Sequence, residues 1–166
     1  METAYADNGV ARVRTGDLHA DNAAANDDVP MFHNLSSLKF YGLLWRECYA
    51  WDAVRLLLCC VPKLQTLAFE SIDHPMFGSL VLTSYLEEPL DIPECLSSHL
   101  MTCHYKGFSG NEVKMELVRQ ILKAARVLKI IKTMAGSHLS SKAKLCIRKE
   151  LMKFLRSSRA CQIAFD

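Results

Sequence analysis

The sequence has no long hydrophobic run, and this absence excludes a membrane-spanning segment. Half of the 166 residues are hydrophobic, yet the longest apolar stretch covers only residues 56–61, whereas a bilayer requires about 20. The start of the chain, residues 1–7, also lacks a basic segment followed by an apolar one, so no secretory signal is predicted. We therefore expect an intracellular protein, in the cytoplasm or the nucleus.

The motifs of common enzymes are missing as well. The sequence contains no G-x-S-x-G nucleophile motif, no Walker phosphate loop and no G-x-G-x-x-G dinucleotide motif. Gly107 and Gly110 precede a predicted helix, where backbone amides can bind a phosphate, but such glycines more often let a strand turn into a helix. The sequence predicts no enzyme activity and no cofactor.

Seven cysteines are present without any C-x-x-C pair, which excludes the usual zinc-ribbon and zinc-finger spacings. An odd number of cysteines with no signal peptide is typical of free thiols in a reducing compartment. Cys95, His99 and Cys103, followed by His104, have the four-residue steps that align ligands along a helix. Because Cys103 also occupies an apolar slot of the repeat described below, we interpret it as a core residue. No metal site is predicted.

Length and composition indicate one globular domain, along which charge is divided unevenly. Residues 1–98 contain 6 Lys and Arg against 14 Asp and Glu, whereas residues 99–166 contain 14 against 4. The net charge of +2 thus combines an acidic first part with a basic second part, an asymmetry that indicates interaction surfaces. Residues 1–30 are rich in Ala, Asn and Asp without an apolar period, and are predicted to form a disordered acidic tail.

An internal repeat is the most informative pattern. The motif Leu-x-x-Leu-x-Phe occupies residues 35–40 and returns at 64–69, then as Leu-x-x-Cys-x-Tyr at 100–105, and in degraded form at 128–133. Its alternating apolar residues predict a short, half-buried strand in each copy. This core with a period in the twenties is the leucine-rich-repeat pattern, which has one strand and one helical segment per unit. The Asn or Cys expected three residues after the third slot is absent from all four copies.

Helical spacing fills the intervals between the predicted strands. Apolar residues recur at this spacing in residues 51–58 and 113–125, and Ser109-x-x-Glu112 supplies a capping-box pattern for the second segment. A last helix is predicted to start near Ser140, and an alternating strand pattern closes the chain at 161–165. The residues expected to be buried by that helix are Ala143, Ile147, Leu151, Phe154 and Leu155. The predicted fold class is α/β.

From residue 92 onward the sequence resembles a known family. Ile92-Pro-Glu-Cys-Leu-Ser-Ser-His-Leu100 is similar to the opening of the FBD domain, found at the C-terminus of plant F-box/leucine-rich-repeat proteins. The resemblance continues through Tyr105-Lys-Gly-Phe-Ser-Gly110, Glu116-Leu-Val118 and Ile121-Leu-Lys-Ala-Ala-Arg-Val-Leu-Lys129, and closes with Arg159-Ala-Cys-Gln-Ile-Ala-Phe-Asp166. Residues 51–67 are similar to the last leucine-rich repeat before that domain.

The resemblance implies a short leucine-rich-repeat-like solenoid with a C-terminal helix-rich FBD cap. The expected divisions are the acidic tail at 1–30, a leucine-rich-repeat-like segment with an irregular insertion at 31–91, and an FBD-like domain at 92–166. The implied function is a non-catalytic protein-interaction module, as in the substrate-recruiting part of a cullin-type (SCF) E3 ubiquitin ligase. In this family an N-terminal F-box docks the ligase adaptor, but residues 1–30 show no F-box-like pattern. An adaptor is therefore an expected partner only if an F-box is supplied elsewhere.

The predicted binding surface consists of the residues between the buried slots, which point outward from the strands. Stacked strands would present them as one face with an aromatic anchor. The candidates are Lys39, Tyr41, Thr66, Glu70, Thr102, His104 and Lys106. The alternative interpretation is that they are merely solvated strand positions. The sequence does not name the protein target.

A second hypothesis assigns a function to the basic half. A basic face can bind nucleic acid or another polyanion with steep salt dependence, although amphipathic helices also carry Lys and Arg simply as a solvated face. The cations are Lys114, Arg119, Lys123, Arg126, Lys129 and Lys132 in one helix and its exit, and Lys142, Lys144, Arg148, Lys149, Lys153, Arg156 and Arg159 after it. No aromatic stacking pattern accompanies them, so the solvated face is favoured. A third hypothesis is that the acidic part docks against the basic part.

Overall fold

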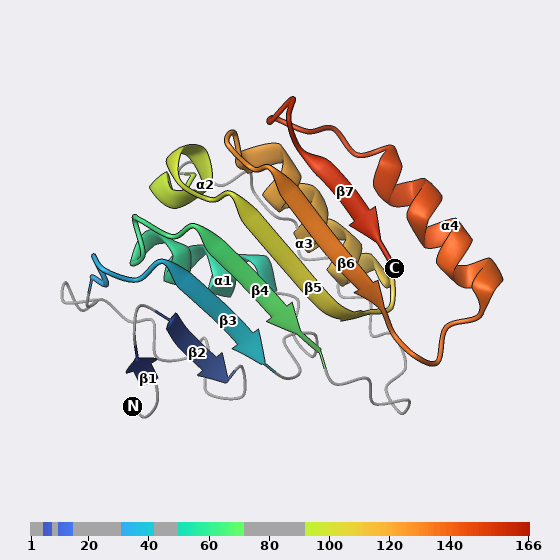
Figure 1. Cartoon of the computed structure of the whole chain (residues 1–166), viewed down its shortest axis with the longest axis horizontal. Helices are drawn as coiled ribbons and strands as arrows, with labels where there is room; N and C mark the ends of the chain where they lie inside the picture. The colour runs from blue at the N-terminus through green and yellow to red at the C-terminus, as the bar shows by residue number, and fades with distance from the viewer. Residues whose placement is uncertain (1–4, 8–9, 15–30, 42–49, 72–91) are drawn as a thin grey trace.

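Seven strands form a single sheet in the computed structural model, which describes residues 5–7, 10–14, 31–41, 50–71 and 92–166 (Figure 1). The strands are β1 (Tyr5–Asp7), β2 (Val10–Arg14), β3 (Ser37–Tyr41), β4 (Thr66–Glu70), β5 (Thr102–Phe108), β6 (Ile130–Ala135) and β7 (Gln162–Phe165). The helices are α1 (Ala50–Cys59), α2 (Glu94–Ser98), α3 (Glu112–Ala124) and α4 (Ser141–Met152). The prediction of an α/β fold is confirmed.

Strand order in the sheet follows strand order in the chain. The β1–β2 pair is antiparallel, and every later pair, from β2–β3 to β6–β7, is parallel. Parallel neighbours require a crossover connection, and α1, α2, α3 and α4 lie in the successive crossovers from β3 to β7. Each crossover returns the chain to the same end of the sheet, so equivalent repeat positions become neighbours.

The register confirms the alignment of the predicted repeat slots. In the second slot, Leu38 pairs with Leu67, Leu67 with Cys103, and Cys103 with Ile131. The first slot, just before each strand, is buried in all four copies: Leu35, Leu64, Leu100 and Leu128. A period-2 strand with one buried face tolerates no one-residue slip, because a slip would turn every apolar side chain to solvent.

The third slot forms an aromatic stack through the core. The rings of Phe40 and Phe69 lie 5.3 Å apart, and those of Phe69 and Tyr105 lie 5.4 Å apart, both in stacked geometry. Phe108 meets Tyr105 edge-on at 4.9 Å. Stacked and edge-on aromatic pairs contribute about 0.5–1.5 kcal/mol each beyond the area they bury. The stack ends at Thr133, the polar residue of the degraded copy, whose Oγ1 donates to the Ala164 carbonyl at 3.1 Å.

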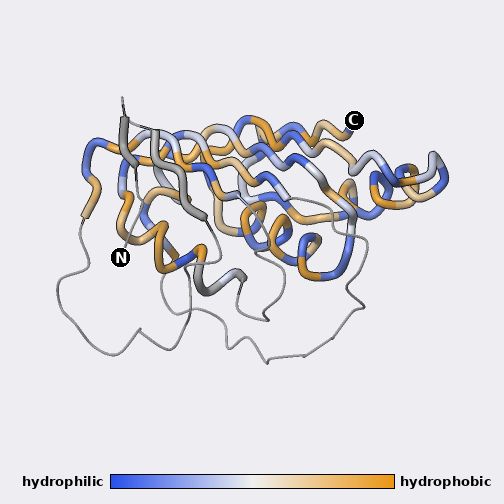
Figure 2. The backbone as a smooth tube through the Cα atoms, turned by 90° about the horizontal axis from the view of Figure 1, so that it is seen from below, coloured by the Kyte–Doolittle hydropathy of each residue, from blue (hydrophilic) through white to orange (hydrophobic). Residues whose placement is uncertain are grey.

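The sheet is covered on one side only. Helices α1, α2 and α3 pack behind it, as the edge-on view in Figure 2 shows, whereas α4 lies beside β7 at the edge of the sheet (Figure 1). Side chains along β3 and β4 alternate between buried and half-buried. Among the described residues, no element covers the other side of the sheet, which leaves a face open to solvent.

Strands occur in two further parts of the chain. Tyr5–Asp7 and Val10–Arg14 are strands of the sheet, within a segment predicted to be disordered; the rest of residues 1–30 and the expected insertion at 72–91 lie outside the described residues. The segment 92–166, expected as a helix-rich cap, contributes three helices and also the strands β5, β6 and β7. Since β4 pairs with β5 along its whole length, the two predicted segments share one sheet and one core.

Helix ends agree with the sequence in part. The cap of α4 is Ser140 as predicted, with its Oγ accepting from the Ala143 amide at 3.2 Å. The cap of α3 is Asn111, whose side chain accepts from the Lys114 amide at 2.9 Å, and not Ser109 as predicted. Leu155, expected in the core, is 86% exposed, because α4 ends at Met152 and the chain then changes direction. The helical period could not be extrapolated past that end.

Candidate functional site

The open face of the sheet holds all seven residues predicted to bind a partner. Thr66 and Thr102 lie opposite each other, as do Glu70 and Lys106. In the same way Tyr41 pairs with Glu70. The two remaining residues are Lys39 on β3 and His104 on β5, which both pair with Ala68 on β4. All seven side chains are half-buried or exposed, so the structure brings them together on three adjacent strands.

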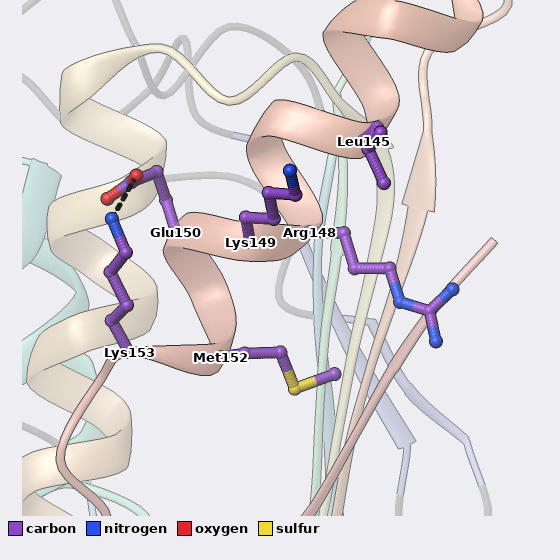
Figure 3. Close-up of a pocket in the computed structure, with 6 residues that line it drawn as sticks. All are labelled: Leu145, Arg148, Lys149, Glu150, Met152 and Lys153. Atoms are coloured by element: carbon purple, nitrogen blue, oxygen red, sulfur yellow. Dashed lines mark hydrogen bonds and ion pairs between the residues drawn. The ribbon is translucent and has the colours of Figure 1, made fainter.

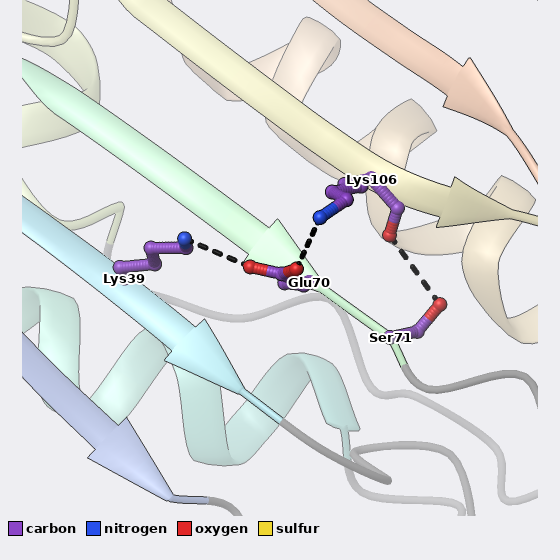
Figure 4. Close-up of polar contacts among 4 residues, drawn as sticks. All are labelled: Lys39, Glu70, Ser71 and Lys106. Atoms are coloured by element: carbon purple, nitrogen blue, oxygen red, sulfur yellow. Dashed lines mark hydrogen bonds and ion pairs between the residues drawn. The ribbon is translucent and has the colours of Figure 1, made fainter.

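An ion-paired triad lies at the carboxyl end of this face. Glu70 on β4 accepts from Lys39 Nζ on β3 at 2.8 Å and from Lys106 Nζ on β5 at 2.6 Å (Figure 4). These hydrogen bonds from Lys106 and Lys39 lower the pKa of Glu70 to about 2, and the bond to Glu70 raises the pKa of Lys39. Lys39 also lies over the Tyr41 ring, 4.4 Å from its centroid. The triad thus has one net positive charge and orients charged groups from three strands.

The open face extends beyond the predicted residues. Ile130, Lys132 and Met134 continue the same rows on β6, where His104 pairs with Lys132 and Lys106 with Met134. Lys132 Nζ lies 3.2 Å from an Asp166 carboxylate oxygen. These three residues could have been predicted from the degraded fourth repeat, because its buried slots determine which neighbouring side chains point outward.

A buried polar cluster lies behind the end of the triad, where β4 and β5 finish. The Lys114 ammonium, on a residue only 3% exposed, donates to Ser71 Oγ at 3.0 Å and to the Gly107 carbonyl at 2.8 Å. Ser71 Oγ donates in turn to the Gly107 carbonyl at 2.6 Å and lies 3.5 Å from the Lys106 carbonyl (Figure 4). Lys114 was predicted as part of a solvated basic face. This prediction is wrong, because the carbonyls at the β5 bulge draw the side chain inward.

Gly107 forms that bulge with a φ of +76°, a value that side chains with a Cβ rarely adopt. A Cβ on this residue would lie 2.5 Å from the Ser71 carbonyl oxygen. Gly110, at φ +70°, is similarly close to the Ile147 side chain. The two glycines therefore serve the turn from β5 into α3, the second of the two interpretations that the sequence offered.

Some of the remaining cations are engaged within the protein. Arg119 pairs with Glu116 and stacks over the Phe154 ring at 4.7 Å, while Lys153 pairs with Glu150 at 2.6 Å. Helix α3 lies behind the sheet and α4 at its edge (Figure 1), so the cations of the two helices belong to different parts of the molecule.

The Cys and His cluster is not assembled as a metal site. Cys95 is buried with its thiol 3.4 Å from the Leu58 carbonyl, and burial raises its pKa to about 12. Cys103 is buried in the second repeat slot, where burial raises its pKa strongly. His104 lies on the opposite face of the same strand. Both thiols are therefore held in the neutral form as core residues.

None of the helices in the described part of the chain is long and apolar enough to cross a membrane.

Comparisons with known proteins place these features in a family context. The FBD family matches residues 87–132. An F-box/FBD/LRR-repeat protein of Arabidopsis thaliana is 33% identical over 142 residues, which are 81% of this chain and 30% of that protein. A second protein of that name is 32% identical over 142 residues, with the same coverage. A third, whose name has the same three parts, is 31% identical over 158 residues, 92% of this chain and 33% of the relative.

The chain thus spans about a third of the length of the curated relatives it matches. No solved structure matches it.

Proposed function

Because the chain belongs to the plant F-box/FBD/LRR-repeat family over most of its length, we propose that it is a non-catalytic protein-interaction module. The open face of the sheet is the surface that holds its protein target. The single observation that carries this proposal is the alignment of seven outward-facing residues on β3, β4 and β5 with the Lys39–Glu70–Lys106 triad among them.

The face suits a protein target better than a small molecule. Its polar groups are spread over adjacent strands and do not converge in a deep cavity, which is what small ligands use. It offers an aromatic side chain beside charged groups that are already oriented, and preorganised groups lose less entropy on binding. Tyr41 with the Lys39 ammonium over its ring is the expected anchor.

The proposal includes a finer architecture. The strand–helix units at 31–91 are leucine-rich-repeat-like and include the irregular insertion, and the FBD-like unit at 92–166 continues and closes their stack. Residues 1–30, which include β1 and β2, form an acidic N-terminal segment. Backbone hydrogen bonds support the repeat, because two amides of each unit donate to one carbonyl of the preceding unit at an equivalent position. The amides of residues 65 and 66 donate to the Ser36 carbonyl, those of 101 and 102 to Gln65, and those of 129 and 130 to Met101.

The proposal also includes a place in a ubiquitin ligase. We infer that the chain recruits a substrate in a reducing intracellular compartment, and that it reaches a cullin adaptor only through an F-box supplied elsewhere. Affinity purification of the tagged chain followed by mass spectrometry tests this. Recovery of cullin and its adaptor with a target supports the ligase role, whereas a reproducible target without them contradicts it.

The open face itself is tested with a matched pair of variants. Replacing Tyr41 with Ala, Glu70 with Gln and Lys106 with Gln removes the anchor and the triad without touching the core. The control variant, Lys63→Gln with Glu112→Gln, changes exposed charges elsewhere. We expect the target to be captured by the wild type and the control, and capture to fall at least tenfold for the face variant, with all three melting temperatures within about 3 °C. Undiminished capture by the face variant would contradict the assignment.

The polyanion hypothesis remains testable in the same preparation. A gel-shift series with single-stranded and duplex nucleic acid between 50 and 200 mM salt would show a steep loss of affinity if the exposed cations bind phosphates. The ion pairs of Arg119, Lys132 and Lys153 and the burial of Lys114 leave fewer free cations than the sequence suggested. We therefore expect no specific complex.

A further inference from the structure

Helix α4 exposes an apolar strip on the side that faces away from the protein. Ile147 and Leu151 are its buried residues, whereas Leu145 is 52% exposed and Met152 is 40% exposed. These two lie seven residues apart, with Arg148 between them, so the three side chains fall on one stripe of the helix. Figure 3 shows them projecting to the same side. Leu155, just after the helix, adds a third exposed apolar side chain.

A shallow hollow follows this strip. Its lining comes from α4 and the residue after it: Leu145, Arg148, Lys149, Glu150, Met152 and Lys153 (Figure 3). Helix α4, which carries most of this lining, lies at the edge of the sheet beyond β7 and away from β3, β4 and β5 (Figure 1). A partner bound there would not compete with one bound to β3, β4 and β5 (Figure 1).

The strip has an uncompensated positive charge. Arg148 and Lys149 are exposed and form no ion pair with another residue of the described part of the chain. Glu150 is the only carboxylate in residues 141–152, and Lys153 already neutralises it at 2.6 Å. Lys144 and Lys142 lie about one and two turns earlier on the same helix. Any occupant must therefore supply apolar side chains together with acidic ones.

We propose that this strip of α4 is the docking site for an acidic amphipathic helix of a protein partner. The stretch from Leu145 to Met152 is about 10 Å long at 1.5 Å per residue, so a partner helix of about three turns covers it. Its apolar residues, at helical spacing, fill the hollow between Leu145 and Met152, and its carboxylates reach Arg148 and Lys149. This is the helix-in-groove mode of peptide recognition.

Other occupants fit less well. A second copy of the chain would bring the same positive charge against itself, which is repulsive. Nucleic acid would satisfy the cations but leave Leu145 and Met152 without a partner, since phosphates bind cations and not leucines. A membrane surface requires a broad apolar helix face, and the principal apolar face of α4, at Ile147 and Leu151, is turned into the protein.

The test uses the full chain and two synthetic helical peptides. The first has leucines at positions i, i+3, i+4 and i+7 with flanking glutamates; the second has the same composition with the stripe scrambled. Fluorescence anisotropy measures both against the wild type, Leu145→Ser/Met152→Ser and Arg148→Glu/Lys149→Glu. The matched controls are Leu56→Ser, an exposed leucine on α1, and Lys63→Glu, an exposed lysine before β4.

We expect the striped peptide to bind the wild type and both controls equally, at least tenfold more tightly than the scrambled peptide. Both α4 variants should lose at least tenfold in affinity with circular dichroism and melting temperature unchanged. Equal binding of the two peptides, loss only in the charge variant, or no binding to the wild type would overturn the proposal. Tighter binding of polyuridylate or phosphatidylserine vesicles than of the striped peptide, abolished by the same substitutions, would assign the strip to RNA or membrane and overturn it too.

Discussion

Replacing Gly107 with Ala is the most informative single test of how the end of the sheet is held together. The new methyl group would lie 2.5 Å from the Ser71 carbonyl oxygen and 2.8 Å from its hydroxyl, and the φ of +76° is unfavourable for alanine. The Ser71 backbone is fixed by its amide, which donates to the Lys106 carbonyl at 3.0 Å. The clash therefore cannot be relieved by turning one flexible side chain.

The magnitude follows from two contributions. A non-glycine residue in the left-handed region costs about 1–2 kcal/mol, and moving Ser71 away weakens at least one of the hydrogen bonds that join it to Lys106, Gly107 and Lys114, each contributing about 0.5–1.5 kcal/mol or more for the charged donor. We expect a loss of about 3 kcal/mol in the free energy of unfolding. With a urea dependence of about 2 kcal/mol per molar, the midpoint should fall by about 1.5 M.

The assay is urea denaturation followed by far-ultraviolet circular dichroism, with Ser109→Ala in the same turn as the control. Ser109 makes no hydrogen bond through its side chain to another described residue, so its variant should lie within about 0.5 kcal/mol of the wild type. If Gly107→Ala were as stable as Ser109→Ala, the packing of the bulge against Ser71 and Lys114 would be refuted. A variant that changed the urea dependence of the unfolding free energy but kept the wild-type midpoint would also contradict a local clash.

Three further predictions concern the core, the triad and a cap. Phe69→Ala should lower the free energy of unfolding in urea by about 4 kcal/mol, because it removes a buried ring between two stacked neighbours, while Phe69→Leu should cost about 1.5 kcal/mol; equal losses would contradict the stack. Glu70 has its pKa held at about 2, below the ordinary 4.5, so its contribution is complete above about pH 4.5 and is lost as the pH falls toward 2. The stability difference between the wild type and Glu70→Gln, measured from pH 6 to pH 2, should shrink over that window, and a constant difference would exclude the ion pairs. Ser140→Ala should destabilise by about 1 kcal/mol through loss of the α4 cap, and thermal melts that coincide with wild type would show that the cap contributes nothing.

The open face could be predicted because it follows from the buried one. Leu38, Leu67 and Cys103 occupy equivalent slots of the repeat, and the strand period of two then fixes the direction of every residue between the slots. The sequence places Lys39, Glu70 and Lys106 on this face but does not predict their ion pairs, because these depend on the register of three strands and not on any one strand.

The buried polar cluster around Lys114 could not be predicted from the sequence, for a different reason. Lys114 belongs to a run of apparently solvated cations on an amphipathic helix, and lysine is rarely buried without a partner. Its acceptors come from Ser71 and Gly107, 43 and 7 residues away, and no local pattern records that they converge. The cap at Asn111 was missed because Ser109 satisfies a capping rule equally well and only the path of the loop distinguishes them.

The ladder between β4 and β5 sets a limit on how this chain can be divided. A fragment that begins at the FBD-like segment would lack β4, so β5 would have an unpaired edge and Tyr105 would lose the stacking contact with Phe69. An exposed edge strand with apolar neighbours is prone to aggregate. The residues that match the FBD family therefore share their sheet with β4, a strand outside the match. Because β4 pairs with β3 on one side and with β5 on the other, substitutions at residues 66–70 would change the packing of both neighbouring strands.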